Sequence, residues 1–267
     1  MPIDAPENSG NQKSNKLLFP VGFLWGAATS SHQVEGGTLN NWSEWEKKNA
    51  NRLAKEAEKK WADWQKEKFP EMFDPQNYIS GRACDHYNRY EEDFDLAKEG
   101  VHNVHRFSIE WSRIEPEEGK FDEKEIEHYR KVILALRERG IEPFVTLWHW
   151  TEPIWFDALG GWVNKKSIKY FSRFVEKIVG EYGDLVNFWI VINEPNVGLG
   201  FGYVTGAQPP AKKNIVSFLR AYFHLISAYK KAYEIIHKIN KTANVGFAHS
   251  YYIYEANLWK PINRIIA

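Results

Sequence analysis

The sequence predicts an α/β fold built around a parallel β-sheet. Strand-like and helix-like segments alternate along the chain, an order typical of βαβ units. The strand-like segments read as continuous apolar runs, as expected for strands that are buried on both faces of a parallel sheet. Gly100 and Gly140 close two of the helix-like segments and add a stop signal before the next strand. The predicted strands cover residues 18–31, 102–111, 141–150, 185–195 and 243–254.

Helices are predicted between these strands. The number of strand and helix pairs that fit into the chain decides whether the barrel can close. A closed barrel of eight β/α units needs about 250 residues, so 267 residues would admit one by length alone. A long insertion after the first strand leaves room for five strands. We therefore expect residues 17–267 to form the N-terminal portion of a single TIM (β/α)8 barrel domain, roughly its first five β/α units. The predicted helices cover residues 89–100, 123–140, 165–183 and 214–240.

Two segments stand outside this alternation. Residues 1–16 are polar and are expected to form a disordered N-terminal tail. Residues 45–69 are rich in Lys, Glu and Ala, which predicts a charged helical insertion that Pro70 and Pro75 end and that extends over about 45–78. Four tryptophans of this region are expected to pack beneath the insertion in preference to lining a site: Trp42, Trp45, Trp61 and Trp64.

Charge and composition exclude several classes of partner. Lys plus Arg and Asp plus Glu both total 35, so no net field attracts nucleic acid or an anionic membrane. No apolar run reaches the ~18 residues of a membrane span, and the N-terminus lacks a signal-peptide pattern. The single cysteine, Cys84, suits a reducing compartment and is expected to be buried. His102 and His105 lie on opposite faces of a strand and indicate no metal. We expect a cytoplasmic protein without a cofactor.

Candidate functional residues come from one rule. In parallel α/β folds, functional groups gather at the C-terminal ends of the strands, where the loops converge. Carboxylate, imidazole and amide groups hydrogen-bond hydroxyls, and tryptophan faces stack on the apolar faces of pyranose rings, so the residue types at these ends predict a sugar site. The rule selects Gln33, Glu110, Arg113, His149, Trp150, Asn193 and Glu194.

Glu194 follows an apolar run and is the candidate general acid. A carboxyl group at the rim of an apolar barrel is partly desolvated, which favours its neutral, proton-donating form. Pro195 has no N–H for the sheet, so it ends the strand at this point. The alternative is a strand-end carboxylate that pairs with a surface lysine, and the pentapeptide INEPN alone favours neither interpretation.

Arg106 lies within the second predicted strand, between apolar neighbours. A buried guanidinium needs an anion, because an unpaired buried charge is costly. That anion belongs either to a catalytic site or to a structural ion pair of the barrel, and Arg106 viewed alone does not distinguish the two.

Five motifs resemble, in order and spacing, those of glycoside hydrolase family 1, the β-glucosidase and β-galactosidase family. The similarity extends from Leu17 to the end of the chain. It implies a (β/α)8 barrel and a retaining glycosidase that uses two glutamates and acts on β-linked glucosides or galactosides. The motifs are FLWGAATSSHQVEGG (23–37), RFSIEWSRIEP (106–116), LWHW (147–150), INEPN (192–196) and GY…G…PP (202–210).

The resemblance also implies residue roles. Glu194 resembles the acid/base, Arg106 the arginine that holds the nucleophile, and Asn193 the donor to the sugar 2-hydroxyl. In a retaining mechanism the acid protonates the leaving oxygen, while a second carboxylate roughly 5–5.5 Å away attacks the anomeric carbon. Three residues match the wall that binds the sugar's hydroxyls: Gln33, His149 and Trp150.

The second carboxylate is where the sequence departs from the family. The family nucleophile lies in a T/S-E-N-G motif on the seventh strand; that motif is absent here, and Glu255 in YEAN is the nearest match. Arg106 would then lack its anion. We therefore expect a β-glycosidase represented by its acid/base half. The alternative is a catalytically incomplete partial barrel that self-associates, binds a complementary C-terminal half or takes a planar apolar ligand.

Two smaller features also yield expectations. Glu152 follows HWT, where the family often has an apolar residue, and is expected to be solvated. The glycine-rich segment 198–206 lacks the Gly-Lys-Ser/Thr ending of a phosphate loop and is expected to be a flexible loop at the barrel rim.

Overall fold

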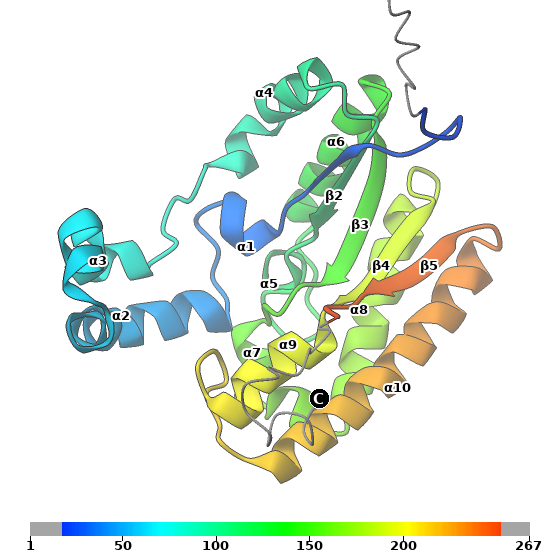
Figure 1. The fold of residues 1–267 in the computed structure, drawn as a ribbon. Helices are drawn as coiled ribbons and strands as arrows, with labels where there is room; N and C mark the ends of the chain where they lie inside the picture. Colours follow the sequence, from blue (N-terminus) through cyan, green and yellow to red (C-terminus); the bar gives the residue numbers. More distant parts are fainter. Residues whose placement is uncertain (1–17, 252–267) are drawn as a thin grey trace, which may run out of the picture.

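The computed structural model describes residues 18–251 and shows one parallel sheet of five strands (Figure 1). The strands lie side by side in chain order, and all four pairings are parallel. The predicted parallel sheet is therefore confirmed. The predicted tail at 1–16, Glu255 and the C-terminal residues lie outside the described part. The strands are β1 (Gly26–Ala28), β2 (Val104–Ser108), β3 (Glu142–Trp148), β4 (Phe188–Asn193) and β5 (Asn244–Ala248).

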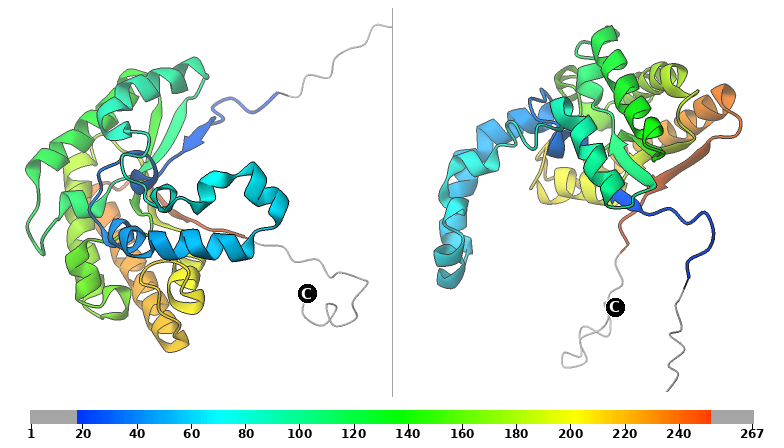
Figure 2. Two further views of the ribbon diagram at one scale, coloured as in Figure 1. Left: turned by 90° about the vertical axis from the view of Figure 1, so that its left-hand side faces the viewer. Right: turned by 90° about the horizontal axis from the view of Figure 1, so that it is seen from above.

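Four long helices connect successive strands and cover one side of the sheet. In Figure 2 they form an arc outside the strands, which is the outer layer of a β/α barrel. All four predicted helices are confirmed, with ends that shift by a few residues. Within residues 18–251, no helix combines the length and apolar character needed to cross a bilayer. The four are α4 (His86–Glu99), α6 (Glu123–Glu138), α8 (Ser167–Tyr182) and α10 (Ile215–Ile239).

A short helix follows each of the first four strands at its carboxyl end. The flexible loop predicted at 198–206 is wrong, because Leu199 and Tyr203 are buried and their packing holds the segment in a helical form. The short helices are α1 (Ser31–Val34), α5 (Trp111–Ile114), α7 (Ile154–Ala158) and α9 (Pro195–Leu199), with the 3-10 turn η3 (Gly161–Val163) after α7 and the π-helical turn η4 (Gly200–Thr205) after α9.

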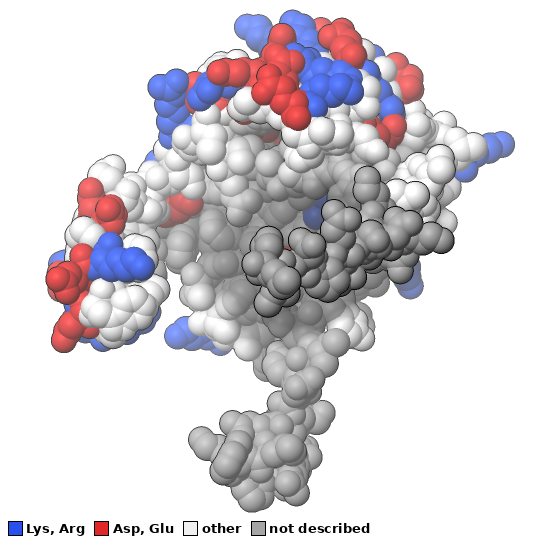
Figure 3. Space-filling model, turned by 45° about the horizontal axis from the view of Figure 1, so that its top comes forward, with Lys and Arg blue, Asp and Glu red and all other residues white. Residues whose placement is uncertain are grey.

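The charged insertion is helical, as predicted, and projects from the body of the molecule (Figure 1). Figure 3 shows acidic and basic side chains intermingled on this projection. Its first helix begins at a capping box, in which the Ser43 backbone N–H donates to Asn40 Oδ1 at 2.9 Å. The insertion comprises α2 (Asn41–Lys60), α3 (Asp63–Lys68), η1 (Pro70–Phe73) and η2 (Pro75–Tyr78).

Two expectations for this region are wrong. Trp61 and Trp64 do not pack beneath the insertion, since their side chains are 42% and 63% exposed. The backbone becomes extended at Trp61, just after the end of α2, and Trp64 lies on the next helix, α3, so the two tryptophans do not share one helical face. Cys84 is exposed instead of buried, because it lies in the connection between η2 and α4.

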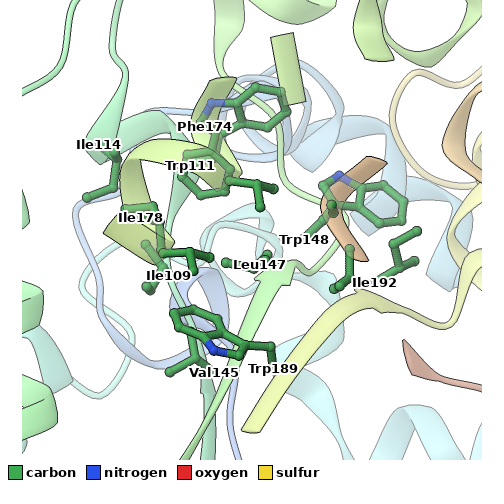
Figure 4. Close-up of a cluster of buried hydrophobic side chains, with 14 of the residues drawn as sticks. Ile109, Trp111, Ile114, Val145, Leu147, Trp148, Phe174, Ile178, Trp189 and Ile192 are labelled. Atoms are coloured by element: carbon green, nitrogen blue, oxygen red, sulfur yellow. The ribbon is translucent and has the colours of Figure 1, made fainter. Parts of the chain in front are cut away.

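The core lies between the sheet and the outer helices (Figure 4). Trp189 of β4 and Val145 of β3 are fully buried in it. The Trp111 ring stacks on the Phe174 ring of α8, with centroids 5.1 Å apart. Helix α8 contributes apolar residues at helical spacing, which orients one face toward the strands: Phe171, Phe174, Val175, Ile178, Val179 and Tyr182.

This core predicts a sharp contrast between two Phe→Ala substitutions. Phe174 is 0% exposed on α8, and Phe223 is 67% exposed on α10. Phe174→Ala should lower the free energy of unfolding by about 3–5 kcal/mol, because it leaves a cavity. Phe223→Ala should change it by less than about 0.5 kcal/mol. Denaturant unfolding of both variants measures this, and equal losses would contradict the placement of the core.

Candidate active site

The carboxyl ends of β1, β3 and β4 bring most of the predicted site residues together. Gln33 lies on α1, His149 and Trp150 follow β3 directly, and Asn193 and Glu194 lie at the end of β4. An open hollow at this edge is lined by Ser30, His32, Gln33, Trp42, His149, Trp150 and Thr151. The rule that functional groups gather at strand ends therefore places three predicted sugar-binding residues around one hollow.

Hydrogen bonds tie Arg106, Trp150 and Asn193 into one unit across three strands. Arg106 Nη2 donates to Asn193 Oδ1 at 2.5 Å, and its Nε donates to Thr146 Oγ1 at 2.9 Å. Trp150 Nε1 donates to the Asn193 carbonyl at 2.9 Å. Asn193 therefore orients both the guanidinium of β2 and the indole that follows β3.

The charge of Arg106 faces Glu194. Burial lowers the pKa of Arg106, and the nearby Glu194 carboxylate opposes that shift. Within residues 18–251, Arg106 has no carboxylate within 4.0 Å, so neutral acceptors supply its direct hydrogen bonds. The anion that the sequence predicts for Arg106 is thus, in the described part of the chain, a nearby but unbonded Glu194.

His149 lies in the same electrostatic environment. Burial, followed by the adjacent Arg106 charge, lowers the pKa of His149 to about 4. The imidazole is therefore neutral near pH 7 and offers one N–H donor and one acceptor nitrogen. Its Nδ1 is buried and has no hydrogen-bond partner among the described residues. A neutral imidazole of this kind is suited to hydrogen-bond an uncharged hydroxyl group.

Two site residues have a strained backbone. Trp150 has φ +74° and Glu194 has φ +40°. Both angles lie in the left-handed region, which residues other than glycine rarely adopt. The strand ends at Asn193, as Pro195 predicts, and Pro195 is the first residue of α9. The Glu194 carbonyl accepts from the N–H of Gly198 at 3.0 Å, so the turn of α9 holds Glu194 at the edge of the sheet.

The structure adds aromatic and polar residues that sequence reasoning missed. The Trp42 ring stacks on Trp150, with centroids 6.5 Å apart and an interplanar angle of 21°. The expectation that Trp42 packs beneath the insertion is therefore wrong, because α2 begins beside the hollow. His32 also lines the hollow, and its Nε2 lies 3.0 Å from Glu46 Oε1. The sequence signal for Trp42 was its position just after Asn40, the N-cap residue of α2.

Glu110 and Arg113 do not join the hollow that the strand-end rule predicts for them. Glu110 is fully buried, and its carboxylate accepts hydrogen bonds from Ser31 Oγ at 2.9 Å and Thr151 Oγ1 at 3.0 Å. Arg113 Nε lies 3.0 Å from Glu35 Oε2. The partners of both side chains belong to the scaffold. Glu110 and Arg113 therefore position the loops and do not line the hollow.

Glu152 is buried, contrary to the prediction from the sequence. It was expected to be solvated, but its side chain lies among Trp148, Tyr203 and Gln208 and is 5% exposed. Burial, and secondarily the Asp157 carboxylate, raises the pKa of Glu152 well above its ordinary value. Segments distant in sequence cover this side chain, which is why its neighbours in the sequence gave no signal.

No group of three or more His, Cys, Asp or Glu side chains within residues 18–251 is arranged to hold a metal ion. His102 and His105, which the sequence placed on opposite faces of a strand, are not part of any such group.

The successive parallel β/α units and the polar groups at their carboxyl edge define the chain as part of a (β/α)8-barrel protein. It belongs to glycosyl hydrolase family 1, whose model matches residues 15–257. The family resemblance of the five motifs is therefore confirmed, as is the partial barrel.

Curated relatives and a solved structure agree with this family. Beta-glucosidase A of Thermotoga maritima is 33% identical over 239 residues, which cover 87% of this chain and 49% of that protein. Beta-glucosidase A of Acetivibrio thermocellus is 34% identical, with 88% and 49% covered. The Thermotoga maritima β-glucosidase in complex with castanospermine has a TM-score of 0.80 at 30% identity, with 93% of this chain and 53% of that chain covered. The chain thus spans about half the length of these relatives.

The buried His149 predicts a pH dependence of stability. Because its folded pKa is about 4 and its ordinary pKa is 6.5, the unfolded state binds more protons between these values. Stability should therefore fall as the pH drops from 6.5 to 4, by at most about 3 kcal/mol from this residue. Denaturant unfolding should show a weaker fall for His149→Gln. The exposed His249→Gln serves as control, and a wild-type slope in His149→Gln would refute the prediction.

Proposed function

We propose that the chain carries the acid/base side of a retaining β-glycosidase site that acts on β-linked glucosides or galactosides. The observation that supports this most directly is the unit formed by Arg106, Asn193 and Trp150, with Glu194 beside it at the open edge of the sheet. The two curated relatives are β-glucosidases, which supports the substrate class. The proposal places the protein in carbohydrate metabolism, in the reducing cytoplasm that its single cysteine suits.

Each residue has a defined role in this proposal. The carboxyl group of Glu194 donates its proton to the leaving glycosidic oxygen and later removes a proton from the attacking water. The amide of Asn193 hydrogen-bonds the sugar 2-hydroxyl, and Arg106 fixes that amide from the other side. Gln33 and the neutral His149 hydrogen-bond further hydroxyls, while Trp150 forms a flat wall for the sugar ring.

Double displacement needs a second carboxylate about 5–5.5 Å from the first, on the opposite side of the anomeric carbon. The T/S-E-N-G sequence that carries it in the family is absent from the 267 residues. We propose that polypeptide beyond residues 18–251, in the same chain or in a complementary one, supplies that group next to Arg106. The hydrogen-bonding groups of Arg106 would then hold it.

The test is the Glu194→Gln substitution in protein that also contains the polypeptide supplying the second carboxylate. It should lower the hydrolysis rate of alkyl β-glucosides by about 10²–10⁴-fold, because a poor leaving group depends on proton donation. Aryl β-glucosides with acidic phenols should lose far less in bond cleavage. Steady-state kinetics on both substrate types measure the difference.

Glu117→Gln is the matched control, since Glu117 is an exposed carboxylate paired with Lys120. It should leave both substrates unaffected. If Glu194→Gln kept full activity on the alkyl glucosides, the acid/base assignment would be wrong. If wild-type protein that includes this second carboxylate hydrolysed neither substrate, the proposed glycosidase function would be refuted.

The edges of the sheet favour a second candidate, a partial barrel that associates without catalysis. Among residues 18–251, β1 and β5 each pair with one neighbour, and all three residues of β1 are exposed. Next to β1 lies an exposed aromatic cluster, in which Phe19 and Trp25 have ring centroids 4.5 Å apart. Unpaired strand edges and exposed apolar groups are typical pairing surfaces.

This candidate predicts self-association of the 267-residue chain. Light scattering coupled to size exclusion should then give a mass that is a multiple of 31.2 kDa, with no glycosidase activity. A species of 31.2 kDa at micromolar concentration would rule out self-association, and active protein of any mass would favour the first candidate.

A further inference from the structure

Glu152 carries a buried carboxyl group that the proposed mechanism does not use. It borders a gap that lies next to the hollow, because Trp42 and Trp150 line both. Glu152 follows β3 by four residues, and its backbone is fixed to the start of α2 on both sides. Its N–H donates to Asn41 Oδ1 at 2.9 Å, and its carbonyl accepts from the Asn41 N–H at 3.0 Å. The side chain therefore has a defined starting point, and it is 5% exposed.

The carboxyl group of Glu152 lies beside Gly161 of η3 and near Tyr203 of η4. A Cβ added at Gly161 would lie 3.2 Å from Glu152 Oε2 and 3.7 Å from the Tyr203 hydroxyl, so both groups flank the same glycine. Glu152 also borders a gap of about 10 Å³ with Gly198, Tyr203 and Gln208. Helix α9 and turn η4 thus form the wall opposite this carboxyl group.

Polar atoms at this gap are poorly satisfied by the protein itself. Trp148 Nε1 and Gln208 Oε1 are buried and have no hydrogen-bond partner within residues 18–251. Both residues line the gap, which is close to the size that one water molecule needs. A protonated carboxyl group can donate to an acceptor and accept from a donor, so Glu152 can complete such a network directly or through a water.

The charged groups around Glu152 favour its neutral form. Burial is the main cause of its raised pKa, and Asp157 of α7 adds repulsion. Lys212, before α10, and the Trp162 indole of η3 oppose both effects. Burial also raises the pKa of Asp157, against Lys212 and Lys48 of α2, and raises the pKa of Tyr203, which faces both carboxyl groups. Within residues 18–251, Glu152 has no cation within 4.0 Å.

The same segment determines where Glu194 and Trp150 lie. Glu194 is the N-terminal cap of α9. A Cβ at Gly198 would come within 2.7 Å of Trp150 Cδ1, so α9 packs closely on Trp150. A Cβ at Gly202 would come within 2.6 Å of the Pro209 carbonyl, so η4 packs closely on the loop that follows it. Any outward movement of this segment displaces the acid/base residue and uncovers the Trp150 ring.

We propose that Glu152 is a positioning residue of the site: its buried carboxyl group, at the gap shared with Gly198 and Tyr203, holds the α9–η4 segment against Trp150 and so sets the place of Glu194. Ionisation of Glu152 would bury an unpaired carboxylate, a state that is relieved when the segment opens to water. The segment is then closed at low pH and opens more readily as the pH rises.

Amide hydrogen exchange on the 267-residue chain tests this without any substrate. The readout is the opening equilibrium of residues 195–206 from pH 5 to 9, referenced to α6. Opening lets Glu152 ionise near its ordinary pKa of 4.5. The wild-type opening equilibrium should therefore rise by up to about tenfold per pH unit relative to Glu152→Gln, until the raised pKa is reached.

Two further variants separate positioning from simple packing. Glu152→Gln keeps the size and a donor and acceptor, so its segment should stay closed across the pH range. Glu152→Leu removes the polar network, and its segment should open at every pH. Asp157→Asn removes the neighbouring acid and should keep the wild-type slope. A flat wild-type profile, or a slope abolished by Asp157→Asn and retained in Glu152→Gln, would overturn the proposal.

The catalytic consequence rests on the proposed function and is measured separately. The kcat/KM of the wild type for alkyl β-glucosides should fall more steeply than that of Glu152→Gln over the pH range in which the segment opens, because ionisation of Glu194 affects both proteins and opening of the segment affects only the wild type. If no hydrolysis is found, the proposed function fails while the exchange profile still decides the role of Glu152. Equal alkaline losses in both proteins would contradict the link between the segment and Glu194.

Discussion

The hydrogen bonds of Asn193 are the constraint on which the site depends. Its side chain accepts a hydrogen bond from Arg106 on β2, and its carbonyl accepts one from Trp150 after β3. One residue at the end of β4 thus fixes the ends of three strands relative to one another. The parallel sheet makes this possible because the carboxyl ends of its strands lie at the same edge. Glu194 follows Asn193 directly, so the hydrogen bonds of Asn193 also fix its position. At Glu194 the chain leaves the sheet in a left-handed backbone conformation.

Burial then decides what each polar group at this edge can do. Arg106 keeps its charge among neutral acceptors, and His149 is held neutral beside it. Glu110 is satisfied by hydroxyl groups, and Glu152 is favoured in its protonated form. In a largely apolar scaffold, charged groups are paired, neutralised or exposed to the mouth. Glu194 lies at the edge of the sheet, near the charge of Arg106, and the acid/base role that we propose for it draws on this position.

The sequence predicted the sheet, the four long helices and the grouping of Gln33, His149 and Trp150, because apolar runs, helix stops and strand ends are local signals. It did not predict features that depend on distant segments. Residues of α2, η3 and η4 bury Glu152, and Ser31 and Thr151 satisfy Glu110. The glycine-rich segment 198–206 became helical through the burial of Leu199 and Tyr203, a tertiary effect that its composition conceals.

The most direct test of the account is a crystal structure of the protein with a β-glucoside analogue. The sugar ring should lie against Trp150, with hydrogen bonds from Asn193 and His149 to its hydroxyls and a Glu194 oxygen about 2.6–3.2 Å from the atom that replaces the glycosidic oxygen. A ring bound elsewhere, or Glu194 turned into solvent with the analogue in the hollow, would contradict it.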